Sequence, residues 1–538
     1  MASIAPITAT LDKRLARHLL RRATFVLDKD TVNSFTGMTV DAAVDALFQP
    51  QTLAASEPKD ATDGYWLSDP NFAALSDNDL LGKTNTVLAW FYYNAVQDTT
   101  VNSKLTMFLH NQFTCSIAGQ RADRAYDYIQ LLQYYATSGE SLRDMALKMT
   151  FDNLMLLYLD NTRNFNFNPN ENFAREFFEL FTIGKGEQVG PGDYTTYTEE
   201  DVVQAARVFT GVVYKDDGLE IDSDTGIRTG YLEPLVHDTD DKTFSARFGN
   251  QTITGRSDEA GMLQELTELI DMIYDQNATA TFLATRLYRY FVSDNITTEI
   301  ENDIIAPLSS TLVSSNYDLS AAAKQLLKSE HFYDADDSDN TDNIIGGIIK
   351  SPLQLSTEII TQFDIDLGDP DVDPAEVYGN KIINTLAGLL FYTTDIPFMP
   401  ESVAGYPAYY QAPAYQNNWF NSNTVITRYR FLEYMAQPNR SFMPIYTDML
   451  WFLENSGVFS DPTNPTLIVE ELTDYVFPEG ACQERKDYLK NDILLQGYPE
   501  SAWLTQWTTH LGGDSTVVQY LLEELLKKTL TCPEYQGF

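Results

Sequence analysis

Apolar and polar residues recur every three to four positions along most of the chain, which is the period of an amphipathic α-helix. Segments with this pattern are expected to be helical at 11–27, 41–47, 80–97, 101–113, 122–137, 142–153, 258–274, 278–292, 300–312 and 319–327. Later helices are expected at 348–363, 424–437, 440–453, 466–476, 482–494 and 517–530. We therefore predict a mainly α fold with one large multi-helix body.

The segment NPNENFAREFFELFTIGKG, at residues 168–186, carries the clearest helix signals. Asn168 is expected to cap the helix, and Glu171, three residues later, completes the spacing of a capping box. The apolar stripe expected to face the core consists of Phe173, Phe177, Leu180 and Phe181. The helix at 168–183 should therefore be buried along one side.

Polar residues of the same helix allow two interpretations. In the first, Glu171 only caps the helix, and Arg175 forms ordinary surface ion pairs with Glu171 and Glu179, each worth about 0.2–0.5 kcal/mol. In the second, Arg175, Glu176 and Glu179 face a cleft, where burial and neighbouring charges shift carboxylate pKa values and prepare them for acid/base work or metal binding. Both interpretations stay open at this point.

The pattern changes in the middle of the chain. Residues 211–256 are rich in Gly, Asp and Thr and contain short β-prone runs, which predicts a small irregular β-containing insertion. His237, Asp238 and Lys242 belong to this insertion. The predicted organisation is an N-terminal helical body at 1–210, the insertion at 211–256, and a C-terminal helical part at 257–538 packed on the same body.

The charge balance limits the kinds of partner. Acidic residues outnumber basic residues 77 to 36, which gives a formal net charge of −41 and a sequence pI near 4.3. Such a surface repels the phosphates of nucleic acids and anionic lipids, so neither is expected to bind. Since no apolar stretch reaches about 18 residues and none precedes the first basic residues, neither a membrane span nor a Sec-type signal peptide is predicted. The sequence fits a cytoplasmic location or export by another route.

One basic segment stands out in this acidic chain. Residues 11–27 read as a basic amphipathic helix, which is expected to dock on carboxylates of the same protein, with His18 as a packed residue rather than a ligand. The three cysteines, Cys115, Cys482 and Cys532, have no CxxC spacing. This spacing excludes a cysteine zinc site and a dense disulfide framework, although it allows one disulfide.

Eight separated segments together resemble one bacterial family. They are LARHLLRRATF, FLHNQFTCS, MLLYLDN with PNENFAREFFELFTIGKG, YTEEDVVQAARVFTG, HDTDDKTF, FLATRLYRYFV, IIKSPLQL, and MPESVAGYPAYYQ with WFNSNTVITR. In this order they resemble the domain of unknown function 1800 over nearly the whole chain, and the SVAGYPAYYQ form resembles members from Bacteroidota. The resemblance implies a mostly helical protein without a settled activity. It also implies a partner of the domain-of-unknown-function 1501 type, which is similar to sulfatases and alkaline phosphatases.

The resemblance also carries over a set of motif positions. In chain order they are His110, Asn111, Glu171, Asn172, Arg175, Glu176, Glu179, His237, Asp238 and Lys242. The chain departs from the family pattern twice, because the family commonly has Trp where Tyr406 stands and a second His near Gln112. A glutamine cannot act as acid or base, so these departures put a chemistry shared by all members in doubt.

Two chemistries can be built on these positions. The predicted ligands of a divalent zinc, manganese or iron ion are His110, Glu176, Glu179, His237 and Asp238, and the acidic surface is also compatible with calcium. Without a metal, Glu176 or His110 would be the general base and Arg175 or Lys242 an anion clamp, which suits hydrolysis or transfer at a sulfate, phosphate or carboxylate. The chain has no HExxH, P-loop or GxSxG motif to favour another chemistry.

These observations predict a hydrolase-like or modifying enzyme. Its pocket would combine the helix at 168–183 with His110 and the loop around His237. The alternative is a non-enzymatic structural or assembly protein, in which the same polar groups form a buried ion-pair network that holds helices in register.

Overall fold

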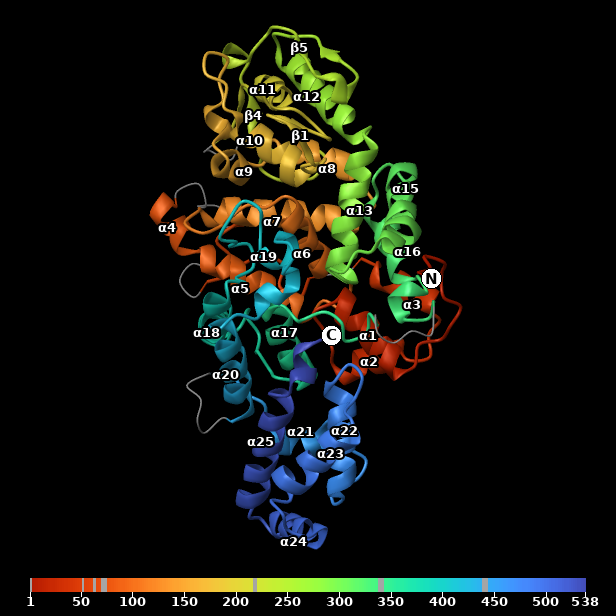
Figure 1. Cartoon of the computed structure of the whole chain (residues 1–538). Helices are drawn as coiled ribbons and strands as arrows, with labels where there is room; N and C mark the ends of the chain where they lie inside the picture. The colour runs from red at the N-terminus through yellow and green to blue at the C-terminus, as the bar shows by residue number, and fades with distance from the viewer. Residues whose placement is uncertain are drawn as a thin grey trace.

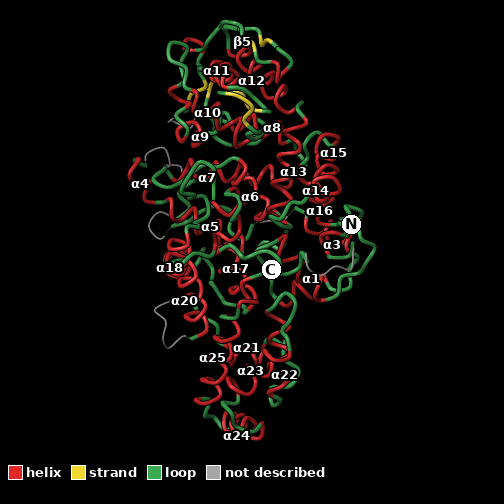
Figure 2. Tube along the Cα trace, viewed as in Figure 1, coloured by secondary structure: helices red, strands yellow, loops and turns green. Residues whose placement is uncertain are grey.

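The computed structural model describes residues 2–50, 53–60, 64–68, 75–215, 220–336, 343–437 and 444–538. Within these ranges helices dominate, and the strands form only three two-stranded antiparallel sheets (Figure 2). The prediction of a mainly α protein with a minor β part is therefore confirmed.

The molecule is elongated, with the two chain ends at its middle level (Figure 1). The middle begins with α1 (Lys13–Ala23), α2 (Lys29–Phe35), α3 (Val40–Leu47), α4 (Asp77–Gly82), α5 (Thr84–Ala95), α6 (Asn102–Gln112) and α7 (Ala122–Thr137). The upper end contains α8 (Leu142–Met149), α9 (Asn153–Tyr158), α10 (Glu171–Glu176), the π-helix η3 (Phe177–Phe181), α11 (Glu199–Val208) and α12 (Glu259–Tyr274). Helix α13 (Asn277–Phe291) then leads the chain back to the middle.

The second half of the chain completes the middle and forms the lower end (Figure 1). The middle receives α14 (Thr298–Ile300), the π-helix η6 (Glu301–Ile305), α15 (Ala306–Ser314), α16 (Leu319–Leu327), η7 (His331–Tyr333), α17 (Pro352–Gln362), the π-helix η8 (Ala375–Ile383), α18 (Asn384–Thr393), α19 (Pro407–Tyr410) and η9 (Tyr415–Trp419). The lower end consists of α20 (Thr424–Ala436), α21 (Met449–Asn455), α22 (Pro465–Val476), α23 (Gln483–Tyr488), the π-helix η11 (Leu489–Leu494), α24 (Glu500–Leu511) and α25 (Thr516–Leu530).

The strands cluster in and beside the predicted insertion. Strand β3 (Val212–Val213) pairs with β4 (Tyr231–Leu232), and β5 (Lys242–Thr243) pairs with β6 (Thr252–Ile253). A third hairpin, β1 (Gln188–Gly190) with β2 (Asp193–Tyr194), precedes the insertion and was not predicted. Residues 216–219 of the insertion lie outside the described residues. The domain boundaries stay predictions.

Burial follows the apolar pattern along the described chain. One contiguous cluster of buried hydrophobic side chains extends from Leu11 to Tyr535. In the described residues no helix has the length and apolar character that a membrane crossing requires. Cys115 and Cys532 are buried, Cys482 is exposed, and all three are free thiols, so the disulfide that the sequence allowed is not formed.

The basic N-terminal helix docks as predicted. In α1, the guanidinium Nε of Arg14 lies 2.8 Å from Glu479 Oε1, and that of the buried Arg21 lies 3.0 Å from Glu358 Oε1. His18 is packed against Phe332, with 2.8 Å between its Nε2 and the Phe332 carbonyl oxygen. Positive residues of an acidic protein thus bind acidic residues that are hundreds of positions away in the sequence.

Candidate functional site

The helix predicted at 168–183 begins at a different residue and is not α-helical throughout. Asn170, not Asn168, is the N-cap, and its side chain accepts a hydrogen bond of 3.0 Å from the backbone N–H of Asn172. Helix α10 starts at Glu171 and changes to a π-helix at Phe177. The predicted start at Asn168 is wrong, because that residue closes a tight turn in which its N–H donates to the Phe165 carbonyl oxygen.

The π-helix also changes which side chains are buried. A π-turn contains more residues than an α-turn, so positions after Phe177 rotate away from the predicted stripe. Phe173, Phe177 and Phe181 are fully buried as predicted, but Phe178 is fully buried too and Leu180 is only half-buried. The Thr182 hydroxyl donates a 2.6 Å hydrogen bond to the Phe177 carbonyl oxygen at the end of this turn. The prediction of a regular α-helical stripe is wrong after Phe177.

Arg175 forms ion pairs at the rim of this helix. Its guanidinium lies 2.7 Å from Glu199 Oε2 and 3.1 Å from Glu171 Oε2. Glu179 instead pairs with Lys185 at 3.0 Å and accepts a hydrogen bond from the Tyr197 hydroxyl at 3.3 Å. These contacts match the first of the two interpretations, in which Arg175 is part of ordinary ion pairs, although its second partner is Glu199 rather than Glu179.

Glu176 lies between these ion pairs. It is half-buried, and burial together with the nearby Glu179 carboxylate raises its pKa above the ordinary value. Such a carboxylate holds its proton more readily than a surface glutamate does. None of five well-formed cavities in the described residues is lined by Glu176, Glu179 or Arg175.

The residues predicted from the insertion form a second, buried group. The Lys242 ammonium lies 2.6 Å from Glu265 Oε2, and His237 Nε2 lies 3.3 Å from Glu265 Oε1. All three side chains are almost fully excluded from solvent. Asp238, next to His237, points to the guanidinium of Arg207, with contacts of 2.8 and 3.1 Å. Glu265, which connects His237 with Lys242, was not among the residues predicted from the sequence.

His110 has a different environment. The side chain is fully buried in α6, and its Nδ1 lies 2.8 Å from the hydroxyl oxygen of Tyr128. The rings of Phe398 and Tyr406 lie 4.9 and 5.9 Å from the imidazole ring. Burial lowers the pKa of His110 to about 3, so the imidazole is neutral at physiological pH.

The five predicted metal ligands do not assemble in this structure. Among the described residues no group of three or more His, Cys, Asp or Glu side chains is arranged to hold a metal ion. His110 contacts aromatic rings, Asp238 pairs with Arg207, and His237 pairs with Glu265. The predicted metal set of His110, Glu176, Glu179, His237 and Asp238 is therefore not supported by the geometry.

One of the five histidines lines a cavity. His331 borders a cavity of about 340 Å³ together with Tyr288, Asp334 and Asp336. Its Nδ1 lies 2.8 Å from Asp336 Oδ2, and its Nε2 lies 2.9 Å from the Tyr288 hydroxyl oxygen. The sequence prediction did not include these residues. We call Tyr288, His331 and Asp336 the Tyr-His-Asp group.

The chain positions the Tyr-His-Asp group with three separate elements. Tyr288 is on the buried face near the end of α13, and His331 begins the short helix η7. Asp334 then adopts a left-handed conformation with φ of 51°, and its carboxylate accepts hydrogen bonds from the backbone N–H groups of Ile344 and Ile345. This turn reverses the chain so that Asp336, two residues later, faces the imidazole.

The charges around this cavity are mostly negative. Among the described residues, its acidic lining residues are Asp294, Glu299, Asp334 and Asp336, and its only basic one is His331. Behind the wall lies the buried guanidinium of Arg22, which interacts electrostatically with Tyr288 and Asp334. Burial lowers the pKa of Arg22 to about 9, and these two partners oppose that shift.

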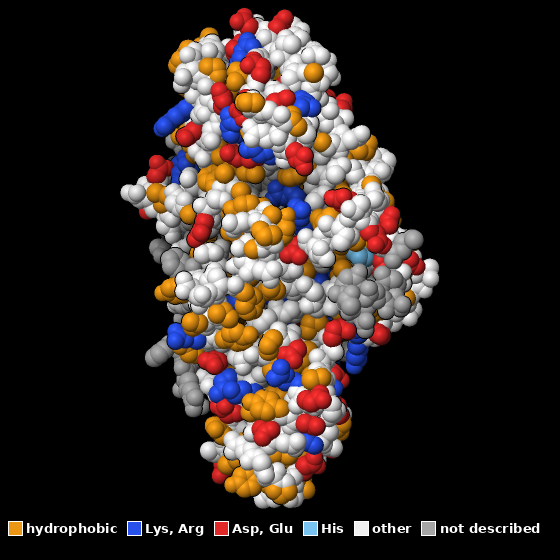
Figure 3. Space-filling model, in the orientation of Figure 1, with side chains coloured by type: hydrophobic (Ala, Val, Ile, Leu, Met, Phe, Trp, Pro, Cys, Tyr) orange, Lys and Arg blue, Asp and Glu red, His pale blue; other side chains and the backbone are white. Residues whose placement is uncertain are grey.

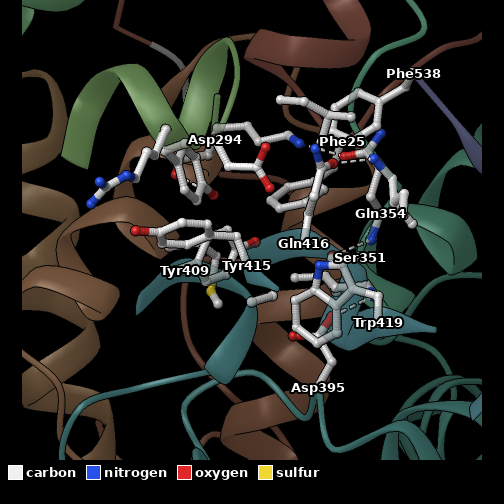
Figure 4. Close-up of a pocket in the computed structure, with 18 residues that line it drawn as sticks. Phe25, Asp294, Ser351, Gln354, Asp395, Tyr409, Tyr415, Gln416, Trp419 and Phe538 are labelled. Atoms are coloured by element: carbon white, nitrogen blue, oxygen red, sulfur yellow. Dashed lines mark hydrogen bonds between the residues drawn. The ribbon is translucent and has the colours of Figure 1, made fainter. Parts of the chain in front are cut away.

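A second cavity adjoins the first and shares Asp294 and Gln416 with it. It measures about 40 Å³. Figure 4 shows Phe25, Phe538 and Gln354 on one side of it and Tyr409 and Tyr415 on the other. Four of the segments that carry the family resemblance, FLATRLYRYFV, IIKSPLQL, MPESVAGYPAYYQ and WFNSNTVITR, contribute lining residues.

Fold and cavities together define a mainly α protein with a histidine-lined cleft. The chain belongs to the family described as "Protein of unknown function (DUF1800)", whose model matches residues 18–537. Neither the curated proteins nor the solved structures contain a significant match to the chain.

Proposed function

We propose that the protein is a hydrolase-like or modifying enzyme whose acid/base group is Tyr288, His331 and Asp336. The observation that carries this proposal is the continuous hydrogen-bonded row from a hydroxyl through an imidazole to a carboxylate at the wall of a cavity. The reaction class agrees with the sequence prediction, but the site lies elsewhere in the chain.

Each member of the row has a defined role. The Asp336 carboxylate accepts the Nδ1–H of His331, which fixes the tautomer with a free lone pair on Nε2. His331 Nε2 then accepts the proton of the Tyr288 hydroxyl, and the nearby Arg22 guanidinium favours the charge that develops on the phenol oxygen. Tyr288 exchanges its proton with the substrate in the cavity, and His331 restores it.

The cavity lining also limits the substrate. Four carboxylates against one imidazole repel sulfate, phosphate and carboxylate groups at the reacting end of a substrate. This disfavours the anion clamp that the sequence suggested through Arg175 or Lys242, because both cations are already paired with carboxylates elsewhere. A neutral ester or a similar uncharged acyl group fits the charge of this cavity.

The test compares hydrolysis of 4-nitrophenyl acetate with that of 4-nitrophenyl phosphate and 4-nitrophenyl sulfate. We expect the wild-type protein to hydrolyse the neutral ester alone. In His331→Asn and Tyr288→Phe the rate of ester hydrolysis should fall by about 10²–10⁴-fold, the range typical of general acid/base groups. The matched control is His510→Asn, since His510 also contacts a hydroxyl and a carboxylate, Ser515 at 2.8 Å and Glu454 at 2.9 Å. His510 lines none of the five cavities. Equal rates in wild type and His331→Asn would refute the proposal.

A second candidate is a non-enzymatic structural or assembly protein, favoured by the internal pairing of His237, Lys242 and Glu265. Glu265→Gln would leave the buried Lys242 ammonium without a counter-charge, and we expect a loss of about 3–5 kcal/mol in the free energy of unfolding. The double change Lys242→Met with Glu265→Leu should recover most of this loss. Such an assembly protein would work with the sulfatase/phosphatase-like partner that the resemblance implies. Co-purification with that partner, together with no turnover of any nitrophenyl compound, would favour this candidate.

A further inference from the structure

Lys104 has an uncommon environment at the smaller cavity. The side chain is only 4% exposed and extends from α6 toward the cavity wall. Its ammonium nitrogen lies 4.4 Å from the ring centre of Phe25 and 5.3 Å from that of Phe538. Its hydrogen-bond acceptor is the neutral amide oxygen of Gln354. Lys104 therefore has no carboxylate partner within ion-pair distance among the described residues.

Burial determines the protonation state of this amine. It lowers the pKa of Lys104 to about 7, and the nearby Arg22 guanidinium contributes in the same direction. About half of the Lys104 amine is therefore neutral at pH 7, compared with fewer than roughly one in 10³ for an ordinary lysine. Only the neutral amine has the lone pair that a nucleophile needs.

Lys350 offers an internal comparison. It is also fully buried, and burial lowers its pKa to about 7 as well. Its ammonium, however, lies 2.9 Å from the buried Glu358 carboxylate, and the side chain lines none of the five cavities. The two lysines differ in access to a cavity and in their partner, not in burial.

A second cation lines the same cavity. Arg289 lies with its guanidinium 4.8 Å from the ring centre of Tyr415, and no ion pair links it to any other described residue. Its buried Nε has no hydrogen-bond partner. Arginine side chains that are free of internal partners are well suited to bind a carboxylate through two parallel hydrogen bonds.

We propose that the Lys104 amine forms a covalent imine with a small 2-oxo acid whose carboxylate is bound by Arg289. This site is independent of the Tyr-His-Asp group, because the imine requires only the residues of the smaller cavity. The smaller cavity adjoins the larger one, with which it shares Asp294 and Gln416.

The step balances with one molecule of water released. The Nζ lone pair attacks the carbonyl carbon, the nitrogen loses one of its two protons, and the carbonyl oxygen takes up a proton, which gives a carbinolamine. The nitrogen then loses its remaining proton, the hydroxyl group takes up a proton and leaves as water, and a C=N bond forms. Asp395 lines the same cavity, and burial raises its pKa to about 7. A carboxyl group that is half-protonated at neutral pH can supply and accept the two protons.

The test uses pyruvate with sodium cyanoborohydride at pH 7, followed by intact mass measurement and peptide mapping. Cyanoborohydride donates a hydride to the imine and makes the bond permanent. We expect one reduced pyruvate adduct at Lys104, formed at least about tenfold faster than at surface lysines because of the larger neutral fraction. Lys350 should stay unmodified, and Lys104→Met should remove the adduct.

Methyl pyruvate lacks the carboxylate charge. It therefore tests imine formation at Lys104 separately from carboxylate binding by Arg289. Arg289→Met should slow the pyruvate adduct but leave the methyl pyruvate adduct unchanged. Pyruvate labelling of surface lysines with Lys104 unmodified would overturn the proposal, and this result does not depend on whether Lys104→Met folds. Equal labelling of Lys104 and Lys350 would also overturn it, because it would mean that the probe enters by chain opening rather than through the cavity.

Discussion

His110 and His331 each lie beside a tyrosine hydroxyl, at 2.8 and 2.9 Å. Their other ring nitrogens differ. Nδ1 of His331 lies beside the Asp336 carboxylate, whereas Nε2 of His110 is buried without a hydrogen-bond partner. A base needs a group that stabilises its protonated form, and of the two histidines only His331 has one, which agrees with its proposed role. One contact at the residue scale thus separates a candidate base from a packed histidine.

The pKa of His110 makes the stability of the protein depend on pH. Burial lowers this pKa to about 3, below the value of about 6.5 for an unfolded histidine. The unfolded chain therefore binds one more proton between these values, and stability falls as pH falls through that window, by about 1.4 kcal/mol per pH unit. Above about pH 6.5 this contribution is constant.

His110→Asn removes that titration. We expect the difference in unfolding free energy between pH 7 and pH 4.5 to be smaller in His110→Asn than in wild type by about 2–3 kcal/mol, measured by urea denaturation at both values. The subtraction cancels the titration of all other groups. If the unfolding free energy changed equally between the two pH values in both proteins, the assignment of a neutral, buried imidazole would be contradicted.

Sequence reasoning grouped some residues that meet in space and missed others for a physical reason. His237, Asp238 and Lys242 are close in sequence and meet in space, as local chain geometry favours. Glu265 is distant, but it carried a signal, because it lies on the apolar face of α12 between Met262 and Leu269. A carboxylate on such a face needs a cationic partner. Tyr288 gave no such signal, since a tyrosine on a buried helix face is ordinary.

At the element scale, the periodic pattern predicted most helices and missed those with an interrupted pattern. The predictions at 122–137 and 319–327 coincide with α7 and α16. Helix α24 was missed because only Trp503 and Trp507 of its side chains are buried, so its apolar stripe is short. Helix α18 was also missed, as was the π-helix η8 before it. Periodicity reveals a helix only when burial and α-helical spacing are both regular.

The N-terminus of α10 allows a direct test of capping. Asn170→Ala removes the side-chain oxygen that accepts the Asn172 N–H, and we expect a loss of about 0.5–2 kcal/mol in the free energy of unfolding. The matched control is Asn168→Ala, since the exposed Asn168 contributes only its backbone to the preceding turn. This control should stay within about 0.5 kcal/mol of wild type. A larger loss of stability in Asn168→Ala than in Asn170→Ala would mean that Asn168 caps the helix, as the sequence predicted.

At the scale of the whole molecule, contacts between distant segments determine where the cavities form. Phe25 near the start of the chain, Lys104 in α6 and Phe538 at the opposite end lie together at the smaller cavity. Local patterns cannot predict such meetings, because each segment alone is compatible with many arrangements of helices. The fold class was therefore predictable, whereas the cleft and the Lys104 environment required the structure.

The net charge of −41 also acts on the whole molecule. Acidic side chains are scattered over the visible face rather than gathered in one patch (Figure 3). Their mutual repulsion destabilises the compact state, whereas exposed ion pairs such as Arg175 with Glu171 contribute at most about 1 kcal/mol each. Salt screens both effects, but acidic residues exceed basic residues 77 to 36, so negative charge is in large excess and repulsion dominates.

We therefore expect sodium chloride to stabilise the protein. Raising its concentration from about 0.01 M to 0.5 M shortens the Debye length from about 30 Å to less than 8 Å, which removes repulsion between distant carboxylates while leaving buried pairs nearly unscreened. The melting temperature should rise by several degrees over this range, measured by calorimetry at pH 7.5. Sucrose at equal osmolality serves as the uncharged control, and the rise in salt should exceed the rise in sucrose. A melting temperature that falls with salt would mean that surface ion pairs, rather than excess negative charge, dominate the electrostatics of folding.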